Sequence, residues 1–482
     1  MTSAAEQLAQ NFSWGTFSKA RELHQRLLFT LGALVVFRFG IFIPLPGIDL
    51  EVYQAAFGGG EESAFQALIQ QINLFAGGAL ENLSIFSLSI FPYISASIIT
   101  QLMRTVVPEF ERLQREGEAG RRKMNQYTRY LTVFIALFQA LGIAMLLENF
   151  PGVDLVMNGG FIFRVTTMVT LTGGTVFLMW MGEQITARGV GNGISLLIFA
   201  GIVASMPDAV GDLLYGMRQN ASAILALAVM LILIISLAMV VLIVYVERAQ
   251  RKVTIQYPSR TAGNKQFQGQ TSFIPMKINA AGVIPAIFAS TIVTLPLLGA
   301  TFGDGLSASS NPVTAGIGAG MIWFATNFRG GEWPYLFLLV GFVVFFTFFY
   351  TAIVFNPEDN AKNLKEYGGF IPGVRPGKQT VAYLDIILSR LTVIGASYLA
   401  FVVAVPEAAR VIVQANSSGL IVPIFLGGTS VLIMVTVSID FVSQIQTHLM
   451  AQQYESLLKR SQQAGKAKRR DTKSSRRTRR IK

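Results

Sequence analysis

The segment IFPYISASIITQL (residues 90–102) is apolar enough for a membrane helix, but it carries an interruption near its start. Pro92 has no backbone N–H to donate, and Ser95, Ser97 and Thr100 place hydroxyl groups in the apolar run. The preceding segment, QINLFAGGALENLSIFSLS (71–89), is also apolar, yet it contains two adjacent glycines and a glutamate. Two imperfect hydrophobic segments in succession predict a membrane helix preceded by a segment that cannot cross the membrane alone.

Composition and apolar runs place the whole chain among membrane proteins. Of its 482 residues, 52% are hydrophobic and 14% are charged, whereas soluble domains carry about 25% charged residues. The first 20 residues are polar and lack a cleavage site, so we expect no cleaved signal peptide. Runs of about 20 apolar residues predict ten spans, at 27–46, 84–103, 131–150, 161–182, 193–212, 221–246, 280–300, 335–355, 386–405 and 420–441. A further apolar stretch, 66–82, is too short and too interrupted by Gly to cross alone.

The distribution of Lys and Arg predicts how the chain is oriented. No Lys or Arg occurs between Arg38 and Arg104, whereas the loop after the second span is rich in both. Because basic loops remain cytoplasmic, both termini are predicted to be cytoplasmic. The outer side then keeps few basic residues, namely Arg164, Arg218, Arg329 and Arg410.

The sequence divides into two halves of five spans each, 1–215 and 216–445, followed by a basic tail at 446–482. This division is typical of an inverted repeat. Loops 247–279 and 356–385 are basic and longer than helix connections require, which favours docking of a partner. The end of the tail, 460–482, is predicted to be disordered alone, with anionic lipid or ribosomal RNA as its partner.

The residues that enzymes and metal sites need are missing. The chain has no Cys and two His, and it contains no metalloprotease, phosphate-loop or serine-hydrolase motif. We therefore expect no enzyme activity, metal or cofactor. Arg38, Glu183 and Asp440 lie near predicted span ends, where snorkelling or helix pairing explains them better than ion coupling. A secondary transporter for a small solute remains the alternative, with the Gly-rich junction between spans four and five (Gly189, Gly191, Gly193) as its binding site.

Seven motifs in order, between about residues 20 and 460, resemble the SecY family of protein-translocase channel subunits, in its bacterial form. They are FPYISASIITQL (91–102), EGEAGRRKMNQYTRYLTV (116–133), GEQITARGVGNGISLLIFAGIVA (182–204), NAAGVIPAIFAS (279–290), FNPEDNAKNLKEYGGFIPGVRPGKQT (355–380), GGTSVLIMV (427–435) and HLMAQQYE (448–455). The resemblance implies an all-α membrane protein of ten helices in two pseudo-symmetric halves. It also implies a passive channel that carries secretory polypeptides across the bacterial plasma membrane and releases membrane segments sideways.

The resemblance also implies where the channel parts lie. A ring of apolar side chains falls on Ile90, Ile94, Ile194, Ile198, Ile287 and Ile433. A short re-entrant plug falls on 66–82, about Phe75, Gly77 and Gly78. A lateral gate opens between spans two and three and spans seven and eight, with Ser95, Ser97 and Gln139 at its contacts. The i, i+4 spacing within the pairs Ile90/Ile94 and Ile194/Ile198 is consistent with one helix face each.

Partners and docking residues follow from the same resemblance. SecE and SecG equivalents would complete a heterotrimer, while the SecA motor ATPase or a translating ribosome would drive transport of signal peptides and nascent chains. SecDF and a YidC-type insertase are further expected partners. Docking falls on Arg251, Arg260, Lys265, Arg375 and Tyr454. Where the bacterial family often has a basic pair, this chain has Asn264 and Lys265, which weakens the case for ribosome binding through that loop tip. An ion pair of Arg375 with Glu358 or Asp359 is the alternative for that arginine.

Overall fold

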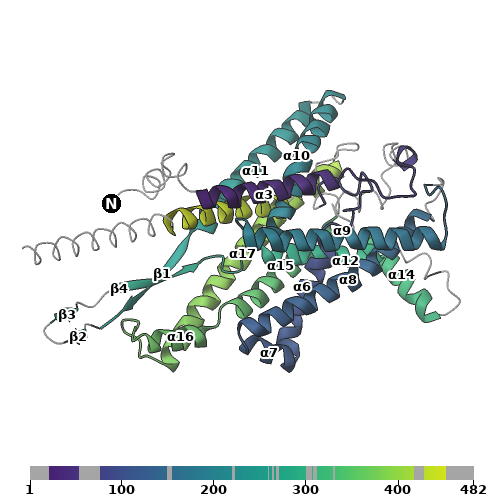
Figure 1. Ribbon diagram of the computed structural model, residues 1–482. Helices are drawn as coiled ribbons and strands as arrows, with labels where there is room; N and C mark the ends of the chain where they lie inside the picture. Colours follow the sequence, from purple (N-terminus) through teal and green to yellow (C-terminus); the bar gives the residue numbers. More distant parts are fainter. Residues whose placement is uncertain are drawn as a thin grey trace, which may run out of the picture.

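A computed structural model describes residues 21–53, 76–148, 155–219, 223–258, 260–262, 265–267, 271–299, 307, 312–328, 332–416 and 428–451. These residues form a bundle of helices from which a small antiparallel sheet projects (Figure 1). The sheet and α16 lie at one end of the bundle, and α14 lies toward the other (Figure 1).

Helices occur at every one of the ten predicted spans, and some shorter helices lie between the spans. In the first half they are α3 (Arg21–Gly40), α6 (Phe91–Val106), α7 (Pro108–Arg115), α8 (Glu118–Glu148), α9 (Phe161–Arg188) and α10 (Gly193–Gln219). In the second half they are α11 (Ala223–Arg248), α12 (Ile284–Gly299), α14 (Pro312–Asn327), α15 (Trp333–Val354), α16 (Pro357–Glu366), α17 (Lys378–Asn416) and the C-terminal helix Gly428–Ala451. Within the described residues, five helical stretches are long and apolar enough to cross a membrane alone, namely Glu118–Glu148, Phe161–Arg188, Trp333–Glu366, Lys378–Ile412 and Gly428–Ala451.

The second predicted span begins later than expected. Ser84 forms an isolated β-bridge with Pro44, residues 85–90 form turns, and α6 starts at Phe91 with Pro92 in its first turn. A proline is tolerated there because the first N–H groups of a helix have no intrahelical partner. Pro92 therefore marks the start of the helix and does not interrupt it.

The loop at 247–279 is a β-hairpin, which the sequence analysis did not predict. β1 (Gln250–Gln256) pairs antiparallel with β4 (Thr271–Lys277), from Gln250 opposite Lys277 to Gln256 opposite Thr271. β2 (Arg260–Ala262) and β3 (Lys265–Phe267) pair farther along the same loop. Val253 and Ile255 are buried and alternate with polar residues, a period of two that is typical of a β-strand. The sequence analysis treated this segment as a loop and did not use that pattern.

The two long loops pack together into one body, which we call the platform: β1, β4, α16, residues 370–377 and the first turns of α17. A bridge joins the loops, since Gln256 N–H donates to the Phe370 carbonyl at 2.9 Å and Phe370 N–H donates back at 3.0 Å. One apolar cluster unites Val253, Ile255 and Met276 of the hairpin with Ala361, Leu364, Ile371, Leu384, Ile387, Leu388 and Leu391. The loops therefore present one surface and not two.

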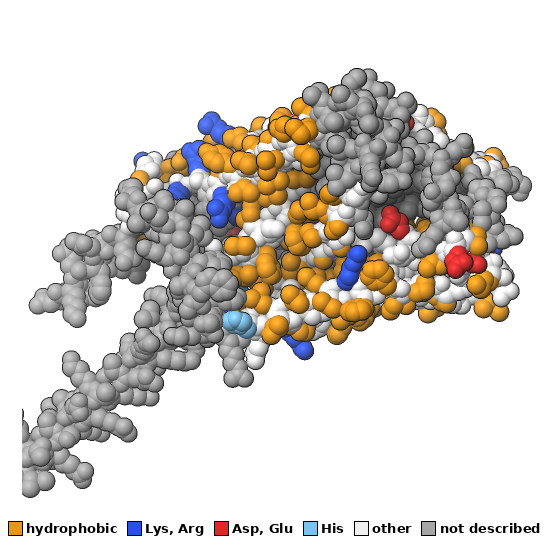
Figure 2. Space-filling view, turned by 90° about the horizontal axis from the view of Figure 1, so that it is seen from above, with side chains coloured by type: hydrophobic (Ala, Val, Ile, Leu, Met, Phe, Trp, Pro, Cys, Tyr) orange, Lys and Arg blue, Asp and Glu red, His pale blue; other side chains and the backbone are white. Residues whose placement is uncertain are grey.

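Much of the outer surface is apolar. In Figure 2 hydrophobic side chains cover a broad area, while Lys and Arg side chains gather toward the left of the view. Helix α3 contributes exposed Leu28, Leu31 and Phe39 to such a surface, and exposed Phe42 lies just beyond its end. An exposed apolar surface of this kind fits contact with lipid. The helix α14, between predicted spans seven and eight, is an apolar element that the sequence analysis did not predict.

The junction between α9 and α10 requires glycine for close packing. A Cβ on Gly193 would overlap the carbonyl oxygen of Gly182 and lie 2.8 Å from the Cβ of Ile185. The Thr186 hydroxyl donates to the Gly182 carbonyl at 2.8 Å and accepts from Gly193 N–H at 2.8 Å. The Gly-rich junction is thus a tight, hydrogen-bonded turn between two helices.

We predict that Gly193→Ala destabilises the protein by about 1–3 kcal/mol, the usual cost of overpacking. The measurement is thermal unfolding of the purified protein in detergent or lipid. Gly173→Ala is the matched control, because a Cβ at that helical position meets nothing within 4 Å. Equal unfolding temperatures for the two variants would contradict the prediction.

Candidate functional site

The predicted ring residues belong to one apolar cluster at the centre of the bundle. Ile90, Ile94, Ile198, Ile287 and Ile433 are buried members of this cluster, with exposed fractions between 0% and 7%. Ile194 is partly buried and packs against it. Ile90 lies directly before α6, and the other five side chains come from α6, α10, α12 and the C-terminal helix, so elements from both predicted halves meet here. The structure brings the predicted ring residues into one cluster, where they fill an apolar interior.

The segment 76–83, which contains residues 76–82 of the predicted plug, is held against that cluster. Ala76 and Ala79 are buried members of it. Arg38 of α3 donates from Nη1 to the Gly77 carbonyl at 2.8 Å, and its guanidinium stacks over the Phe42 ring at 5.2 Å from the centroid. Gly77 has φ +66°, and a Cβ there would lie 2.8 Å from the Cα of Gly201 in α10. Close contact with α10 and a positive φ therefore both require glycine at this position.

Side chains from neighbouring turns satisfy the carbonyls of the same segment. The Ser87 hydroxyl donates to the Ala79 carbonyl at 3.0 Å, and the Tyr53 hydroxyl donates to the Leu80 carbonyl at 2.9 Å. Burial, together with the carboxylate of Glu81, raises the pKa of Tyr53 above its ordinary value, so its hydroxyl remains a donor. Sequence reasoning assigned no role to Arg38, Tyr53 or Ser87 in holding this segment; the contacts of Arg38 and Tyr53 join residues 39 and 27 positions apart.

The predicted gate residues lie on α6 and α8, and α6 packs against both α8 and α12. Ser95 is 2% exposed, and its Oγ has no hydrogen-bond partner among the described residues. Gln139 of α8 is 8% exposed, and its Oε1 is likewise unpartnered there. Ser97 accepts a hydrogen bond from Gln101 Nε2 at 3.1 Å. Buried polar atoms without partners make this seam less stable than an apolar one, at about 1–3 kcal/mol for each group.

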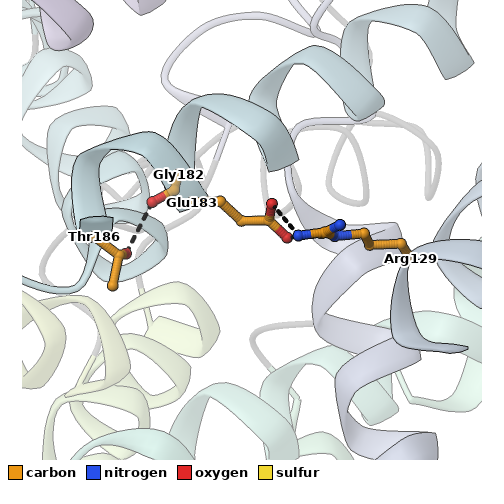
Figure 3. A network of polar contacts seen from close by, with 4 residues as sticks. All are labelled: Arg129, Gly182, Glu183 and Thr186. Carbon is orange, nitrogen blue, oxygen red and sulfur yellow. Dashed lines mark hydrogen bonds and ion pairs between the residues drawn. The ribbon is translucent and has the colours of Figure 1, made fainter. Parts of the chain in front are cut away.

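The three ionisable residues near span ends have partners. Glu183 of α9 forms a two-pronged ion pair with Arg129 of α8, with N–O distances of 2.8 and 2.7 Å (Figure 3). The same view shows Thr186 donating to the Gly182 carbonyl one turn away. Asp440 Oδ1 lies 3.9 Å from Lys277 Nζ, and Arg38 donates a hydrogen bond to the Gly77 carbonyl. Helix pairing, one of the two explanations that the sequence favoured, is observed for Glu183.

The Gly-rich junction also contacts the C-terminal helix. Gly191 N–H donates to Gln444 Oε1 at 2.7 Å, and Val190 N–H donates to the Thr30 hydroxyl at 3.1 Å. These contacts connect the junction to α3 and to the last helix of the second half. Neighbouring side chains occupy the space around it, and His/Cys/Asp/Glu clusters suited to a metal are absent from the described residues.

Four of the five predicted docking residues lie in the two cytoplasmic loops that the sequence predicted. Arg251 lies in β1, and Arg375 is exposed in the loop before α17, where its carbonyl accepts from the Thr380 hydroxyl at 3.0 Å. No ion pair joins Arg375 to Glu358 or Asp359, which are all described, so that alternative is wrong. The backbones of Arg260 and Lys265 lie in β2 and β3. Phe75 and Tyr454 fall outside the described residues.

Comparisons with known proteins agree with this architecture. A family model described as SecY matches residues 84–442. Protein translocase subunit SecY of Escherichia coli (strain K12) is 46% identical over 448 residues, covering 92% of this chain and 96% of that protein. The protein of the same name from Vibrio cholerae is 46% identical over 445 residues, with the same coverage.

Solved structures resemble the fold. The structure described as "The structure of a protein conducting channel" aligns with a TM-score of 0.58 at 17% identity, covering 88% of this chain and 92% of that one. "Sec61 in the Canine ribosome-channel complex from the endoplasmic reticulum" aligns with a TM-score of 0.55 at 16% identity, also covering 88% of this chain and 92% of that one.

Fold and site together define a polytopic helical membrane protein with an apolar central cluster and no catalytic constellation among the described residues. The chain belongs to the SecY family. It is a membrane-embedded, channel-forming subunit of a protein translocase and not an enzyme. The alternative of a secondary transporter for a small solute is not supported.

We predict that Gly77→Ala loosens segment 76–83. The new Cβ would collide with Gly201, and alanine at a positive φ adds about 1 kcal/mol of strain. Because the chain has no Cys, a cysteine at the buried Ala79 reports opening through its rate of maleimide labelling. Gly78→Ala is the control, since its φ is +88° but a Cβ there meets nothing within 4 Å. Gly77→Ala should label faster than Gly78→Ala, and equal rates would contradict a role for the Gly201 contact.

Proposed function

We propose that Ile90, Ile94, Ile194, Ile198, Ile287 and Ile433 form the constriction through which secretory polypeptides pass. The observation that carries this proposal is that five of them are buried in one cluster and Ile194 packs against it, with contributions from four helices of both halves. A collar of branched apolar side chains keeps ions out by dewetting and can fit around a passing chain without binding it strongly. In this structure five of the six side chains are buried among other apolar side chains.

Segment 76–83, which contains the described part of a plug at 66–82, would stop the channel at rest. Its two glycines and its irregular backbone prevent it from becoming a lipid-stable helix. The bonds from Arg38, Tyr53 and Ser87 hold it by polar contacts, which a polypeptide entering the channel displaces more readily than a packed apolar helix.

Helices α6 and α8 on one side and α12 and α15 on the other would form the lateral gate, with Ser95, Ser97 and Gln139 at the seam. The unpartnered polar atoms of Ser95 and Gln139 support this assignment, because they lower the stability of the closed seam. Small hydroxyl side chains also permit close and reversible helix contact. The halves 1–215 and 216–445 would separate here to release membrane segments into lipid.

The chain would span the bacterial plasma membrane with both termini in the cytoplasm. The platform carries many of the basic residues of loops 247–279 and 356–385, and positive loops remain inside. The tail, 446–482, would bind anionic lipid or ribosomal RNA. Small SecE- and SecG-like subunits would complete the complex, and SecDF and a YidC-type insertase would act with it.

The platform would dock the SecA motor ATPase and the ribosome. Its exposed Arg375 lies in a Pro- and Gly-rich turn and forms no ion pair with the neighbouring acids, so its guanidinium is available to an acidic or RNA partner. The ribosome-bound channel among the structural neighbours supports a ribosome as one partner. Arg251, Arg260, Lys265 and Tyr454 are the further proposed contacts.

The ring assignment predicts that Ile94→Asn combined with Ile433→Asn raises resting ion conductance in a planar bilayer. Polar side chains hydrate a constriction that apolar ones keep dry. The same variant should pass precursors with defective signal sequences. Ile99→Asn, on the exposed face of α6, is the control and should leave conductance unchanged. Unchanged conductance in the double variant would overturn the ring.

The docking assignment predicts that Arg375→Ala lowers affinity for SecA or the ribosome about tenfold, the effect of losing about 1.4 kcal/mol. Affinity is measured with the channel in lipid nanodiscs, as a function of salt. Lys362→Ala, an exposed cation on α16 of the same platform, is the control for net charge. Equal losses in both variants would show that only the overall charge matters.

A further inference from the structure

A buried carboxylate and a buried amide meet at the base of the hairpin. Glu247, in the last turn of α11, is 5% exposed, and Asn279, between β4 and α12, is 2% exposed. Asn279 Nδ2 donates to Glu247 Oε1 at 2.6 Å and to the Gly282 carbonyl at 3.1 Å. The first bond joins the end of one helix to the chain that enters the next.

This pair is not an obvious stabilising device. Burying a carboxylate and an amide costs free energy unless every polar atom is satisfied. Here Asn279 Oδ1 and the hydroxyl of Tyr398 on α17 are buried and have no hydrogen-bond partner within the described residues. A well-packed apolar pair would hold the same elements without that cost, so the polar pair calls for a role beyond stability.

The position of the pair suggests that role. Ile278 N–H donates to the Ala249 carbonyl at 3.2 Å, which closes the base of the hairpin beside Glu247. On the other side, Asn279 is followed after a short turn by α12, which carries Ile287 and packs against α6. Helix α17 packs closely on the same point, since a Cβ on Gly395 would lie 3.2 Å from the Ile278 carbonyl oxygen.

The turn at 278–283 is the direct covalent link from the hairpin to α12. A six-residue turn alone transmits force poorly, because its dihedral angles absorb displacement. The two hydrogen bonds of Asn279 span this turn, one to α11 and one to Gly282 near the start of α12. Through Asn279 they connect the end of α11 to the turn that leads from β4 into α12.

We propose that the Glu247–Asn279 pair couples the platform to the gate: a partner that displaces the platform moves α12 through this pair and so opens the seam between α12 and α6. Asn279 and Glu247 are positioning residues, and they act through α12 without touching the translocating chain. The inference rests on the docking and gate roles proposed above, and it adds the residues that connect them.

The test measures gate movement directly. The chain has no Cys, so spin labels at Ile99→Cys on α6 and Phe345→Cys on α15, both exposed positions, report the separation of the two gate walls. The full complex in lipid nanodiscs is measured by pulsed electron spin resonance with and without vacant ribosomes, and ribosome affinity is measured on the same samples. With native Glu247 and Asn279, the ribosome should shift the distance distribution.

Asn279→Leu and Glu247→Ala should each bind ribosomes with unchanged affinity but lose the ribosome-induced shift. Glu247→Gln keeps an acceptor oxygen for Asn279 and should retain the shift. Thr392→Val removes a buried hydrogen bond within α17 and should also retain it. If Asn279→Leu does not fold, loss or retention of the ribosome-induced shift in Glu247→Ala tests the coupling.

A full shift in both Asn279→Leu and Glu247→Ala would overturn the coupling. Loss of the shift in Thr392→Val as well would also overturn it, because general loosening would then explain the result. If the channel with native Glu247 and Asn279 does not bind ribosomes, the docking proposal is wrong. The affinity measurement shows this outcome independently of the distance measurement. Ribosome binding by that channel without any shift would overturn the inference itself.

Discussion

Every backbone N–H and C=O inside a bilayer needs a partner within the protein, and the structure depends on how segment 76–90 meets that requirement. The segment is not helical over most of its length, so its carbonyls depend on side chains and turns. Arg38, Tyr53 and Ser87 supply donors, and the backbone of Ile43 and Leu45 pairs with Ile85 and Leu83. Non-helical chain can therefore lie among membrane helices, but only while these bonds hold.

This constraint connects the central cluster to the gate. Segment 76–90 leads directly into α6, so Ile90 belongs at once to the end of the irregular chain and to the apolar cluster. Helix α6 then packs against α12, whose entry from the platform is fixed by Asn279. Segment 76–90, the central cluster, the proposed gate helices and the platform are thus joined by short pieces of chain.

The sequence predicted the parts of this protein that depend on local pattern. Ten apolar runs gave ten helices, because a span needs only length and apolarity, and the motifs predicted the family correctly. The β-hairpin was missed, because its alternation is short and is stabilised by packing on α16 and α17. The helix α14 was also missed, since its apolar run is shorter than a span.

What the sequence determined by itself is the class of the chain: a ten-span membrane protein without catalytic chemistry, whose apolar runs and basic loops follow from the energetics of the bilayer. Tertiary structure alone decided which polar groups meet. The hydrogen bonds from Arg38 to Gly77, from Arg129 to Glu183 and from Asn279 to Glu247 join residues that lie between 32 and 54 positions apart in the sequence. No local pattern encodes such pairs, because they form only once the helices have packed and brought distant side chains within hydrogen-bonding distance.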